Sequence, residues 1–513
     1  MENTILPTMA LAALFLFLFL KATFRHGQKY NLPPGPKAWP IIGNFDLIGA
    51  LPHRSIHELS KKYGPLMHLR FGSFPLIVAS SVDMTRFFLK TKDILYVDRP
   101  KFASGMYTTY NYADITWSPY GAYWCQARRI CLTKLFSPRR LALMAHIRVD
   151  EVHAMVRNLF AASGPKRVVH LYRDHMSTLS LNVITRMVMG KRLFADGSSE
   201  GPVPSTEVFR WMIDELFLLN GVLNIGDSIP WLDWMDLQGY VRRMKKVGKM
   251  FDALMEHVLD EHSVGEHRRR EGEAARDMVD VLMDIADDPS LEVPLGRIGV
   301  KAFTQDLIAG GTESSAATVE WAMSELLRRP DAFDVATKEL DRIVGRGRWV
   351  MEEDMPNLPY IEAMVKETMR MHPIVPLLIP RVAREDAAVG GYDVPKGARV
   401  LINVWAMGRD PELWDAPEEF RPERFIGSKI DVKGQDLELL PFGSGRRMCP
   451  GYNLGLKEVR LSLANLLHGF TWTLPEGMSK EEVSMEEVFG LTTSRKYPLE
   501  VVADPKLPTH LYL

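Results

Sequence analysis

Cysteine is scarce in this chain of 513 residues, which contains only Cys125, Cys131 and Cys449 and no C-x-x-C pair. Three cysteines cannot form the disulfide framework of a small secreted domain, and they suit a reducing compartment. Without a C-x-x-C pair, the usual ligand spacing of a structural zinc site is missing as well. A chemical role for cysteine in this protein therefore rests on a single side chain.

The chain also lacks an excess of either charge, with 63 basic and 64 acidic residues. This balance gives no general attraction to nucleic acid, so we expect no nucleic-acid partner, and a charged partner would have to use a local patch. No linker rich in serine, glycine and proline and no internal repeat divides the sequence. We therefore expect one large globular domain over residues 31–513.

Only one long uncharged apolar run occurs, from Ile5 to Leu20. With the apolar residues that follow, it approaches the roughly 20 residues that a helix needs to span a bilayer. A cleaved signal peptide would need small residues after the run, but basic residues and a stiff P-P-G-P turn follow instead. We expect residues 1–30 to be a membrane anchor with the main domain in the cytosol, the alternative being an ordinary buried helix.

Cys449 lies in the glycine-rich stretch P-F-G-S-G-R-R-M-C-P-G, directly ahead of an apolar helical pattern. Arg446, Arg447, free backbone N–H groups and the start of that helix would each favour a thiolate. An inert buried thiol is the simplest alternative. A phosphatase nucleophile would need an arginine shortly after the cysteine, and residues 450–455 offer none. An axial thiolate on a haem iron fits better, because glycines let the backbone lie against a flat ring.

The same stretch resembles the F-x-x-G-x-R-x-C-x-G signature of the haem-thiolate monooxygenases, the cytochrome P450 superfamily, in Phe442, Gly445, Arg447, Cys449 and Gly451. The resemblance implies a mainly α-helical fold with small β-sheets. It implies haem b (iron-protoporphyrin IX) bound through Cys449, with Phe442 and Arg447 beside it. It further implies an oxidoreductase that uses O₂ and NADPH, with electrons delivered by a flavoprotein NADPH–cytochrome reductase.

Trp124 and Arg128 are four residues apart in a segment, 123–136, that can be helical. They therefore share a helix face, where an indole N–H and a guanidinium could both meet a carboxylate. A surface cation–aromatic pair is the alternative. The spacing resembles the family's W-x-x-x-R, which implies contact with a haem propionate, and Arg381 matches the position of a further propionate partner.

The longest helical pattern, 298–329, contains two adjacent glycines, each of which costs about 1 kcal/mol relative to alanine. Phe303, Leu307, Gly310 and Ser314 share one face, so the glycines would open that face to a ring or a small ligand. A kink with serine bonded back to the chain is the alternative.

The run A-G-G-T-E-S-S in this helix resembles the family's oxygen-binding groove. The resemblance implies that Glu313 and Ser314 deliver protons to the reacting oxygen. Ser314 stands where the family usually has threonine. It keeps the hydroxyl donor but lacks the methyl group that restricts the rotamer, so we expect looser positioning and less efficient coupling.

Glu367 and Arg370 are three residues apart on a helix, a spacing typical of an ordinary surface ion pair. Together with Pro422-Glu423-Arg424-Phe425 they resemble the family's E-x-x-R and P-E-R-F elements. The resemblance implies a buried structural cluster in which Arg424 completes the hydrogen bonding of Glu367.

The family's substrate-contact positions fall on mostly apolar residues of this chain. These positions are Phe303, Leu307, Gly310, Val375, Leu377, Leu378, Phe489 and Leu491. The substrate lid matches Trp211, Met212, Phe217 and Leu223 by position. A ligand bound there should be a lipophilic small molecule.

Other patterns predict the supporting elements. Alternation predicts two short strands between 63 and 78, and the stretch 101–123, without any period, predicts a long loop. Polar interruptions occur at 196–204 and 261–276, the second of which we expect to be a solvated, mobile loop. A basic cluster at 242–249 indicates either a solvated helix face or a contact with anionic lipid.

The motifs look like those of plant microsomal members, and this likeness implies an anchor in the endoplasmic reticulum membrane. We prefer hydroxylation of a flavonoid-like phenolic, with oxidation or C–C cleavage of a terpenoid as the alternative and sterol oxidation also open. A haem-thiolate isomerase or dehydratase, or a haem sensor, is the alternative from another class. Reductase docking is expected at a basic patch of Arg128, Arg129, Lys134, Arg139 and Arg140.

Overall fold

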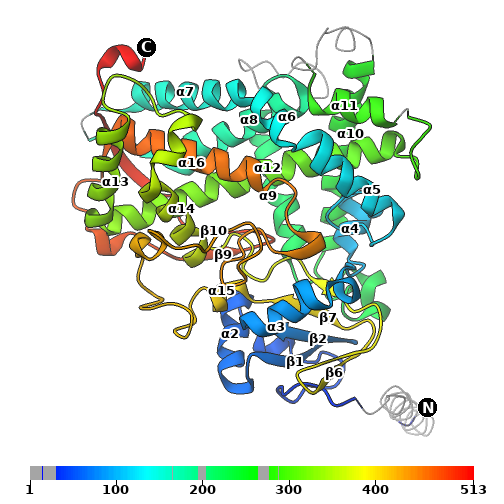
Figure 1. The fold of residues 1–513 in the computed structure, drawn as a ribbon. Coiled ribbons are helices and arrows are strands. Elements are labelled where there is room, and N and C mark those ends of the chain that lie inside the picture. Colours follow the sequence, from blue (N-terminus) through cyan, green and yellow to red (C-terminus); the bar gives the residue numbers. More distant parts are fainter. Residues whose placement is uncertain (1–13, 15–29, 165, 194–203, 264–275, 287) are drawn as a thin grey trace, which may run out of the picture.

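The longest helix, α12 (Gly296–Arg328), runs through the middle of the fold (Figure 1). It contacts α8, α10, α11, α14 and α16, and it is buried along most of its length. A helix enclosed on all sides has no reason to be amphipathic, and its polar residues bond back to the preceding turn, as Thr304 and Thr312 do. The predicted helix at 298–329 is confirmed.

The computed structural model of the chain describes residues 14, 30–164, 166–193, 204–263, 276–286 and 288–513. α-Helices are the predominant regular structure of this part of the chain. Besides α12 they are α2 (Pro52–Tyr63), α3 (Val82–Arg86), α4 (Ala103–Thr108), α5 (Ala122–Ile130), α6 (Pro138–Leu143), α7 (Ala145–Ala162), α8 (Ser177–Met189), α9 (Thr206–Gly221), α10 (Tyr240–Ser263), α11 (Met278–Ala286), α13 (Pro330–Ile343), α14 (Pro359–Met371), α15 (Val404–Met407) and α16 (Tyr452–Gly469).

The largest sheet has the strand order β1-β2-β7-β4, from β1 (Leu66–Phe71), β2 (Phe74–Ala79), β7 (Arg399–Ile402) and β4 (Arg381–Val382). β1 and β2 are antiparallel, with Leu66 opposite Ala79, whereas β2 and β7 are parallel. Three smaller sheets join β3 (Val168–His170), β11 (Glu500–Pro505) and β8 (Phe470–Thr473), β5 (Ala387–Val389) and β6 (Tyr392–Val394), and β9 (Glu487–Phe489) and β10 (Thr493–Arg495). The predicted pair of strands and the mainly α fold with small sheets are both confirmed.

The apolar core is divided between a large helical part and a smaller part around the first sheet. The helical core includes Phe251, Val319 and Leu463, all fully buried. Ile77, Phe88 and Val400 belong to the core on one side of the sheet. The cavity described below is lined mainly by residues of the helical core, such as Phe303 and Leu307, with Leu378 from the side of the sheet.

The prediction of a long loop at 101–123 is partly wrong. The stretch 101–123 contains the helix α4, which packs against α10, and Gly248 of α10 lies against the carbonyl of Tyr107. Only the remainder is irregular, and three consecutive residues there, 110–112, have left-handed backbones with φ of 54°, 56° and 64°. The helix went undetected because its packing partner, not its own periodicity, stabilises it.

Several predictions concern segments outside the described residues. These are the anchor in residues 1–30, apart from Leu14 and Tyr30, and most of the polar stretches at 196–204 and 261–276. Within the described residues, no helix is long and apolar enough to cross a membrane.

The predicted Glu–Arg–Arg cluster is present and buried. The carboxylate of Glu367 accepts from Arg370 Nε (2.7 Å) and Nη2 (2.8 Å) and from Arg424 Nε (3.0 Å). The backbone N–H of Arg421 donates to the same carboxylate at 2.7 Å. Glu367 is fully buried, so the cluster joins α14 to the segment 421–425 in the protein interior.

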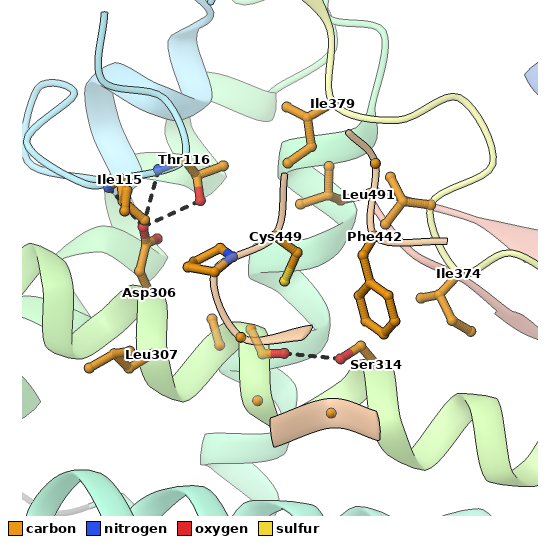
Figure 2. Close-up of a pocket in the computed structure, with 18 of the residues that line it drawn as sticks. Ile115, Thr116, Asp306, Leu307, Ser314, Ile374, Ile379, Phe442, Cys449 and Leu491 are labelled. Atoms are coloured by element: carbon orange, nitrogen blue, oxygen red, sulfur yellow. Dashed lines mark hydrogen bonds between the residues drawn. The ribbon is translucent and has the colours of Figure 1, made fainter. Parts of the chain in front are cut away.

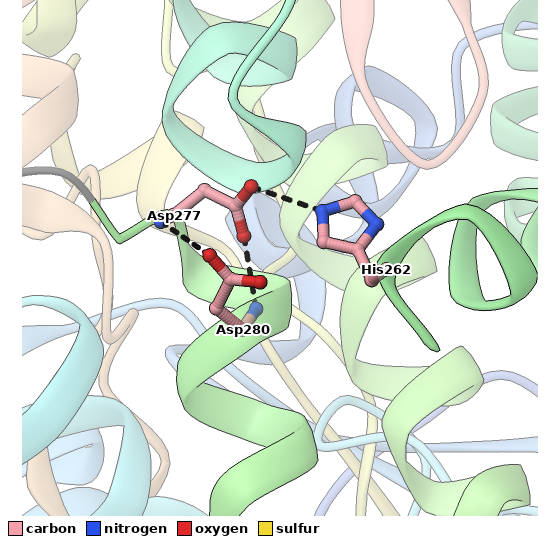
Figure 3. Close-up of side chains that lie close together, drawn as sticks. All are labelled: His262, Asp277 and Asp280. Atoms are coloured by element: carbon pink, nitrogen blue, oxygen red, sulfur yellow. Dashed lines mark hydrogen bonds and ion pairs between the residues drawn. The ribbon is translucent and has the colours of Figure 1, made fainter. Parts of the chain in front are cut away.

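A second buried ionic cluster joins the end of α10 to the start of α11 (Figure 3). His262 Nε2 lies 2.9 Å from Asp277 Oδ2, and its Nδ1 donates to the Val258 carbonyl at 2.7 Å. Burial opposes protonation of His262, but Asp277 and the carbonyl outweigh it and raise its pKa above 6.5. The His262 nitrogen and the carboxylate oxygens of Asp277 and Asp280 lie within 4.8 Å of one another, close enough to be considered as metal ligands. Both ring nitrogens of His262 face acceptors, however, which is the arrangement of an imidazolium ion pair.

Candidate functional site

A cavity of about 350 Å³ lies between α12, α5 and the cysteine loop. Cys449 projects into it opposite the glycine-containing face of α12 (Figure 2). The loop that presents Cys449 is held by the bond from its N–H to the Phe442 carbonyl (3.0 Å), and Phe442 lines the same cavity. The sequence prediction that these residues share a site is therefore met by the geometry.

The charges around Cys449 differ from the prediction in one respect. Arg446 and Arg447 were expected to favour the thiolate, but Arg446 turns outward and pairs with Asp93 at 3.1 Å. Arg447 donates to the carbonyls of Val97, Ile115 and Ser118. Burial raises the pKa of the Cys449 thiol, and the Gly451 backbone N–H and Arg128 lower it only in part. A bound metal cation would supply the missing stabilisation of the thiolate.

Four arginines line the same cavity: Arg99, Arg128, Arg381 and Arg447. Among the described residues, no carboxylate forms an ion pair within 4.0 Å of any of them, and the Arg128 side chain makes no hydrogen bond. Nη1 of Arg381 is buried without an acceptor. Burial and mutual repulsion lower the pKa of Arg447 to about 9, and burial lowers that of Arg381 to about 10. The described residues give the cluster no directly bonded counter-ion, although Asp114 lies nearby, and the two carboxylates of haem b fit it.

Trp124 lies beside this cluster, with Arg447 stacked over its ring at 4.2 Å. Its indole N–H donates to the Ile115 carbonyl at 3.1 Å. Trp124 and Arg128 both line the cavity from α5, as predicted, but the indole N–H already has an acceptor. In this structure Trp124 therefore orients Arg447 through a cation–π contact.

The two glycines of α12 have different roles. A Cβ on Gly310 would meet no atom within 4 Å, because Gly310 borders the cavity. A Cβ on Gly311 would lie 2.7 Å from Ile184, so this glycine lets α12 pack closely on α8. Ser314 lines the cavity and donates back to the Gly310 carbonyl at 3.0 Å (Figure 2). The open helix face and the serine back-bond therefore occur together.

Glu313 lies next to the cavity, not in its lining. Its buried Oε2 has no hydrogen-bond partner among the described residues. Burial raises the pKa of Glu313 to about 7, although the neighbouring Thr492 hydroxyl lowers it. Thr492 lines the cavity, so this hydroxyl connects the Glu313 carboxyl with the site.

Six of the eight predicted substrate contacts line the cavity: Phe303, Leu307, Gly310, Val375, Leu378 and Leu491. Leu377 and Phe489 do not line it. Leu378 has a left-handed backbone (φ 49°), and this turn directs Leu377 into the core beside the first sheet. Phe489 stacks on His53 at 6.0 Å, outside the lining. Of the four lid residues only Phe217 reaches the cavity, because Met212 is buried in the helical core and Trp211 and Leu223 are exposed.

Several lining residues were not predicted. They include Ile115, Thr116, Asn220, Asp306, Ile374 and Ile379. Asp306 lies on the predicted helix, one turn before Gly310, and this spacing is the only sequence signal that could have found it. The others lie in irregular segments or at the end of α9, where periodicity gives no information.

Comparisons with known proteins place these observations in a family. The cytochrome P450 pattern matches residues 33–500. Trimethyltridecatetraene synthase of Zea mays is 49% identical, with 100% of this chain and 95% of that protein covered. Dimethylnonatriene synthase of Zea mays is also 49% identical, with 100% and 99% covered. Flavonoid 3'-monooxygenase of Petunia hybrida is 41% identical, with 100% and 99% covered.

Solved structures agree with these sequence relatives. A zebra fish cytochrome P450 with abiraterone has a TM-score of 0.73 and 27% identity, covering 89% of this chain and all of that chain. The chain therefore belongs to the cytochrome P450 family: it is a monooxygenase that holds haem b through a cysteine thiolate and takes electrons from a redox partner to oxidise a lipophilic substrate.

Proposed function

We propose that this enzyme hydroxylates a flavonoid-like phenolic, with Cys449 as the axial haem ligand. The observation that carries the proposal is the single cavity that brings together Cys449, the uncompensated arginines and the open face of α12. When bound, the haem supplies activation of O₂ and insertion of one oxygen atom into the substrate. Arg99, Arg128, Arg381 and Arg447 would hold its carboxylates.

Proton delivery falls to two hydroxyl groups and one carboxyl group. Ser314 presents its hydroxyl at the cavity wall, and the pKa of about 7 lets Glu313 hold and release a proton near neutral pH. Thr492 lines the cavity and is near enough to Glu313 to lower its pKa, so its hydroxyl can pass that proton on. Glu313 therefore acts through a neighbouring hydroxyl group and does not touch the substrate.

The preference for a phenolic rests on the mixed lining of the cavity. Phe217, Phe303 and Trp117 offer aromatic faces, and contacts with a planar ring are worth about 0.5–1.5 kcal/mol beyond burial. Asn220 and Thr492 add polar groups that can meet phenolic hydroxyls. Several relatives, including the Petunia protein, carry flavonoid monooxygenase names.

Oxidation of an acyclic terpenoid is the second candidate. The two Zea mays relatives named for branched polyenes are 49% identical, compared with 41% for the Petunia flavonoid enzyme. The cavity is also lined by Leu307, Leu378 and Leu491. These side chains can bind the flexible alkyl groups of a terpenoid through burial of apolar surface alone. Because Phe489 lies outside the cavity, one expected aromatic contact is missing, and this also favours the second candidate.

A spectroscopic titration tests both the ligand and the substrate class. The carbon monoxide spectrum of the reduced protein should show the red-shifted band of a thiolate ligand, which Cys449→Ala should lose and the exposed Cys125→Ala should keep. Naringenin and the terpenoid alcohol farnesol are then compared by spin-state titration of the oxidised enzyme, followed by mass analysis of products. If farnesol changes the spin state and naringenin does not, the second candidate replaces the first.

NADPH consumption separates the monooxygenase from the other class considered. A haem-thiolate isomerase, dehydratase or sensor needs no proton-delivering pair beside the oxygen site. The monooxygenase should consume NADPH only with reductase and O₂ present. A product formed in the absence of reductase, or in the absence of O₂, would contradict the proposal.

We propose further that the enzyme is anchored in the endoplasmic reticulum membrane and receives electrons from the NADPH–cytochrome reductase. Support for membrane contact comes from exposed apolar residues on two adjoining segments. They are Trp39, Ile41, Ile42, Trp231, Trp234 and Met235. Backbone bonds from Gly72 to Ile42 and from Ser73 to Ser228 hold the two segments side by side.

The basic patch for the reductase is smaller than predicted. Arg129, Lys134 and Arg139 are exposed, whereas Arg128 lines the cavity and Arg140 is buried. Arg140 donates to the Asp277 carbonyl at 3.1 Å, which fixes it to the start of α11. The three exposed cations remain as the proposed docking patch.

A further inference from the structure

The segment 114–118 lies between α12 and the arginine cluster and lines the cavity through residues 114–117. Both sides of its backbone are bonded to side chains. On the α12 side, Oδ2 of Asp306 accepts from Ile115 N at 2.9 Å, Thr116 N at 3.3 Å and Thr116 Oγ1 at 3.3 Å (Figure 2). One carboxylate oxygen therefore gathers three donors from two consecutive residues.

The opposite side of the same segment is bonded to the cationic cluster. Arg99 Nε donates to the Thr116 carbonyl at 3.0 Å, and Arg447 donates to the carbonyls of Ile115 (3.2 Å) and Ser118 (2.6 Å). The segment is thus held by hydrogen bonds to Asp306 on one side and to Arg99 and Arg447, which we assign to the haem carboxylates, on the other.

Regular secondary structure does not hold this segment. It follows α4 and the three left-handed residues 110–112, a conformation that is unfavourable for residues with a Cβ. Ile115, Thr116 and Trp117 nevertheless line the cavity and would touch a substrate. Their positions depend on the side chains that bond the segment.

We propose that Asp306 is a positioning residue for substrate recognition, which fixes the segment 114–118 to α12 while Arg99 and Arg447 fix it to the cofactor end of the cavity. This inference rests on the proposed function, because it assigns the cavity to haem and substrate. It makes substrate affinity and the position of oxidation depend on a carboxylate that need not contact the substrate.

The charge of Asp306 is sensitive to its surroundings. Asp114 faces it from the segment, Tyr123 from α5 and Cys131 from the turn that follows α5, and Arg99 lies close to Asp114. Burial raises the pKa of both carboxyls, and the three donors lower that of Asp306, so Asp306 keeps the charge of the pair. As the pH falls, protonation of Asp306 would remove the negative charge that strengthens its three hydrogen bonds, and would loosen the segment.

Asp306→Asn tests the inference, with Glu256→Gln as the matched control. Glu256 pairs with Lys301 of α12 at 2.5 Å, so the control removes a charge that contacts the same helix away from the segment. Both variants should bind haem, give the thiolate-type carbon monoxide band, and bind imidazole, which needs only the iron, with unchanged affinity.

The substrate probe should separate the two variants. For whichever of naringenin and farnesol binds the wild type more tightly, the dissociation constant should rise about tenfold in Asp306→Asn and remain unchanged in Glu256→Gln. The wild type should lose affinity as the pH falls, and Asp306→Asn should show a flat profile. The products of Asp306→Asn should include oxidation at additional positions.

Two results would overturn the inference while leaving the proposed function intact. One is a haem-loaded Asp306→Asn protein with wild-type probe affinity and pH profile. If that variant does not retain haem, Thr116→Val, which removes one of the three donors, replaces it. Unchanged affinity and product pattern in Thr116→Val would then be the second refuting result. Absence of a thiolate-type band in the wild type would instead refute the proposed function.

Discussion

Replacing Glu367 by glutamine should cost more stability than its conservative appearance suggests. The carboxylate receives four donors, of which Arg370 Nε, Arg370 Nη2 and Arg424 Nε are cationic. Glutamine keeps one acceptor oxygen but brings an NH₂ group against guanidinium N–H groups, and it leaves two largely buried cations without a counter-ion. Removing one partner of a buried ion pair costs about 3–5 kcal/mol.

This cost translates into a modest change in melting temperature because the chain is long. With about 2.1 cal/mol/K of unfolding entropy per residue, 513 residues give a shift of roughly 1 °C per kcal/mol, so Glu367→Gln should melt about 3–5 °C lower. Calorimetry of the haem-loaded protein measures this shift. Glu423→Gln is the control, because among the described residues the Glu423 carboxylate accepts a hydrogen bond only from the Tyr360 hydroxyl. Equal melting temperatures for the two variants would refute the reasoning.

Three further predictions follow from single contacts. Gly311→Ala should destabilise the protein by about 1–3 kcal/mol in thermal melts, because its Cβ would lie 2.7 Å from a side chain of α8. Gly310→Ala should instead melt about 1 °C higher than the wild type, because alanine gains about 1 kcal/mol of helix propensity without a clash, and it should weaken probe binding. Because the pKa of His262 is raised in the folded state, its charged form stabilises the fold below pH 6.5, and this stabilisation is lost as the pH rises through the folded-state pKa. In urea unfolding, His262→Gln should therefore lower the free energy of unfolding more at pH 5.5 than at pH 8. The opposite order would contradict the ion pair. Reversing Lys134 and Arg139 to glutamate should slow reductase-dependent turnover more at low salt than at high salt, and equal slowing would exclude electrostatic steering.

Sequence patterns predicted the parts of the site that lie on regular helices or in a rigid motif. Phe303, Leu307, Gly310 and Ser314 share a face because a helix has a fixed repeat, and all four line the cavity. Glu367 and Arg370 meet for the same reason. In these cases spacing along the chain determines direction in space.

The errors occur where direction depends on a local backbone angle. Arg446 and Arg447 are neighbours, but the short helical turn 445–447 sends one outward to Asp93 and the other inward. The left-handed backbone of Leu378 turns its neighbour Leu377 away from the cavity. No periodic pattern reports such angles, and Asp306 was missed because its partners belong to a segment without periodicity.

The parallel pairing of β2 with β7 has a consequence for synthesis of the chain. Some 320 residues separate the end of β2 from the start of β7, so the edge of β2 has no native partner until most of the protein has been translated. At about 5–20 residues per second this delay lasts roughly 16–64 s. During that time an apolar strand edge is open to wrong pairing, and we expect the nascent chain to depend on chaperones that cover the hairpin 66–79.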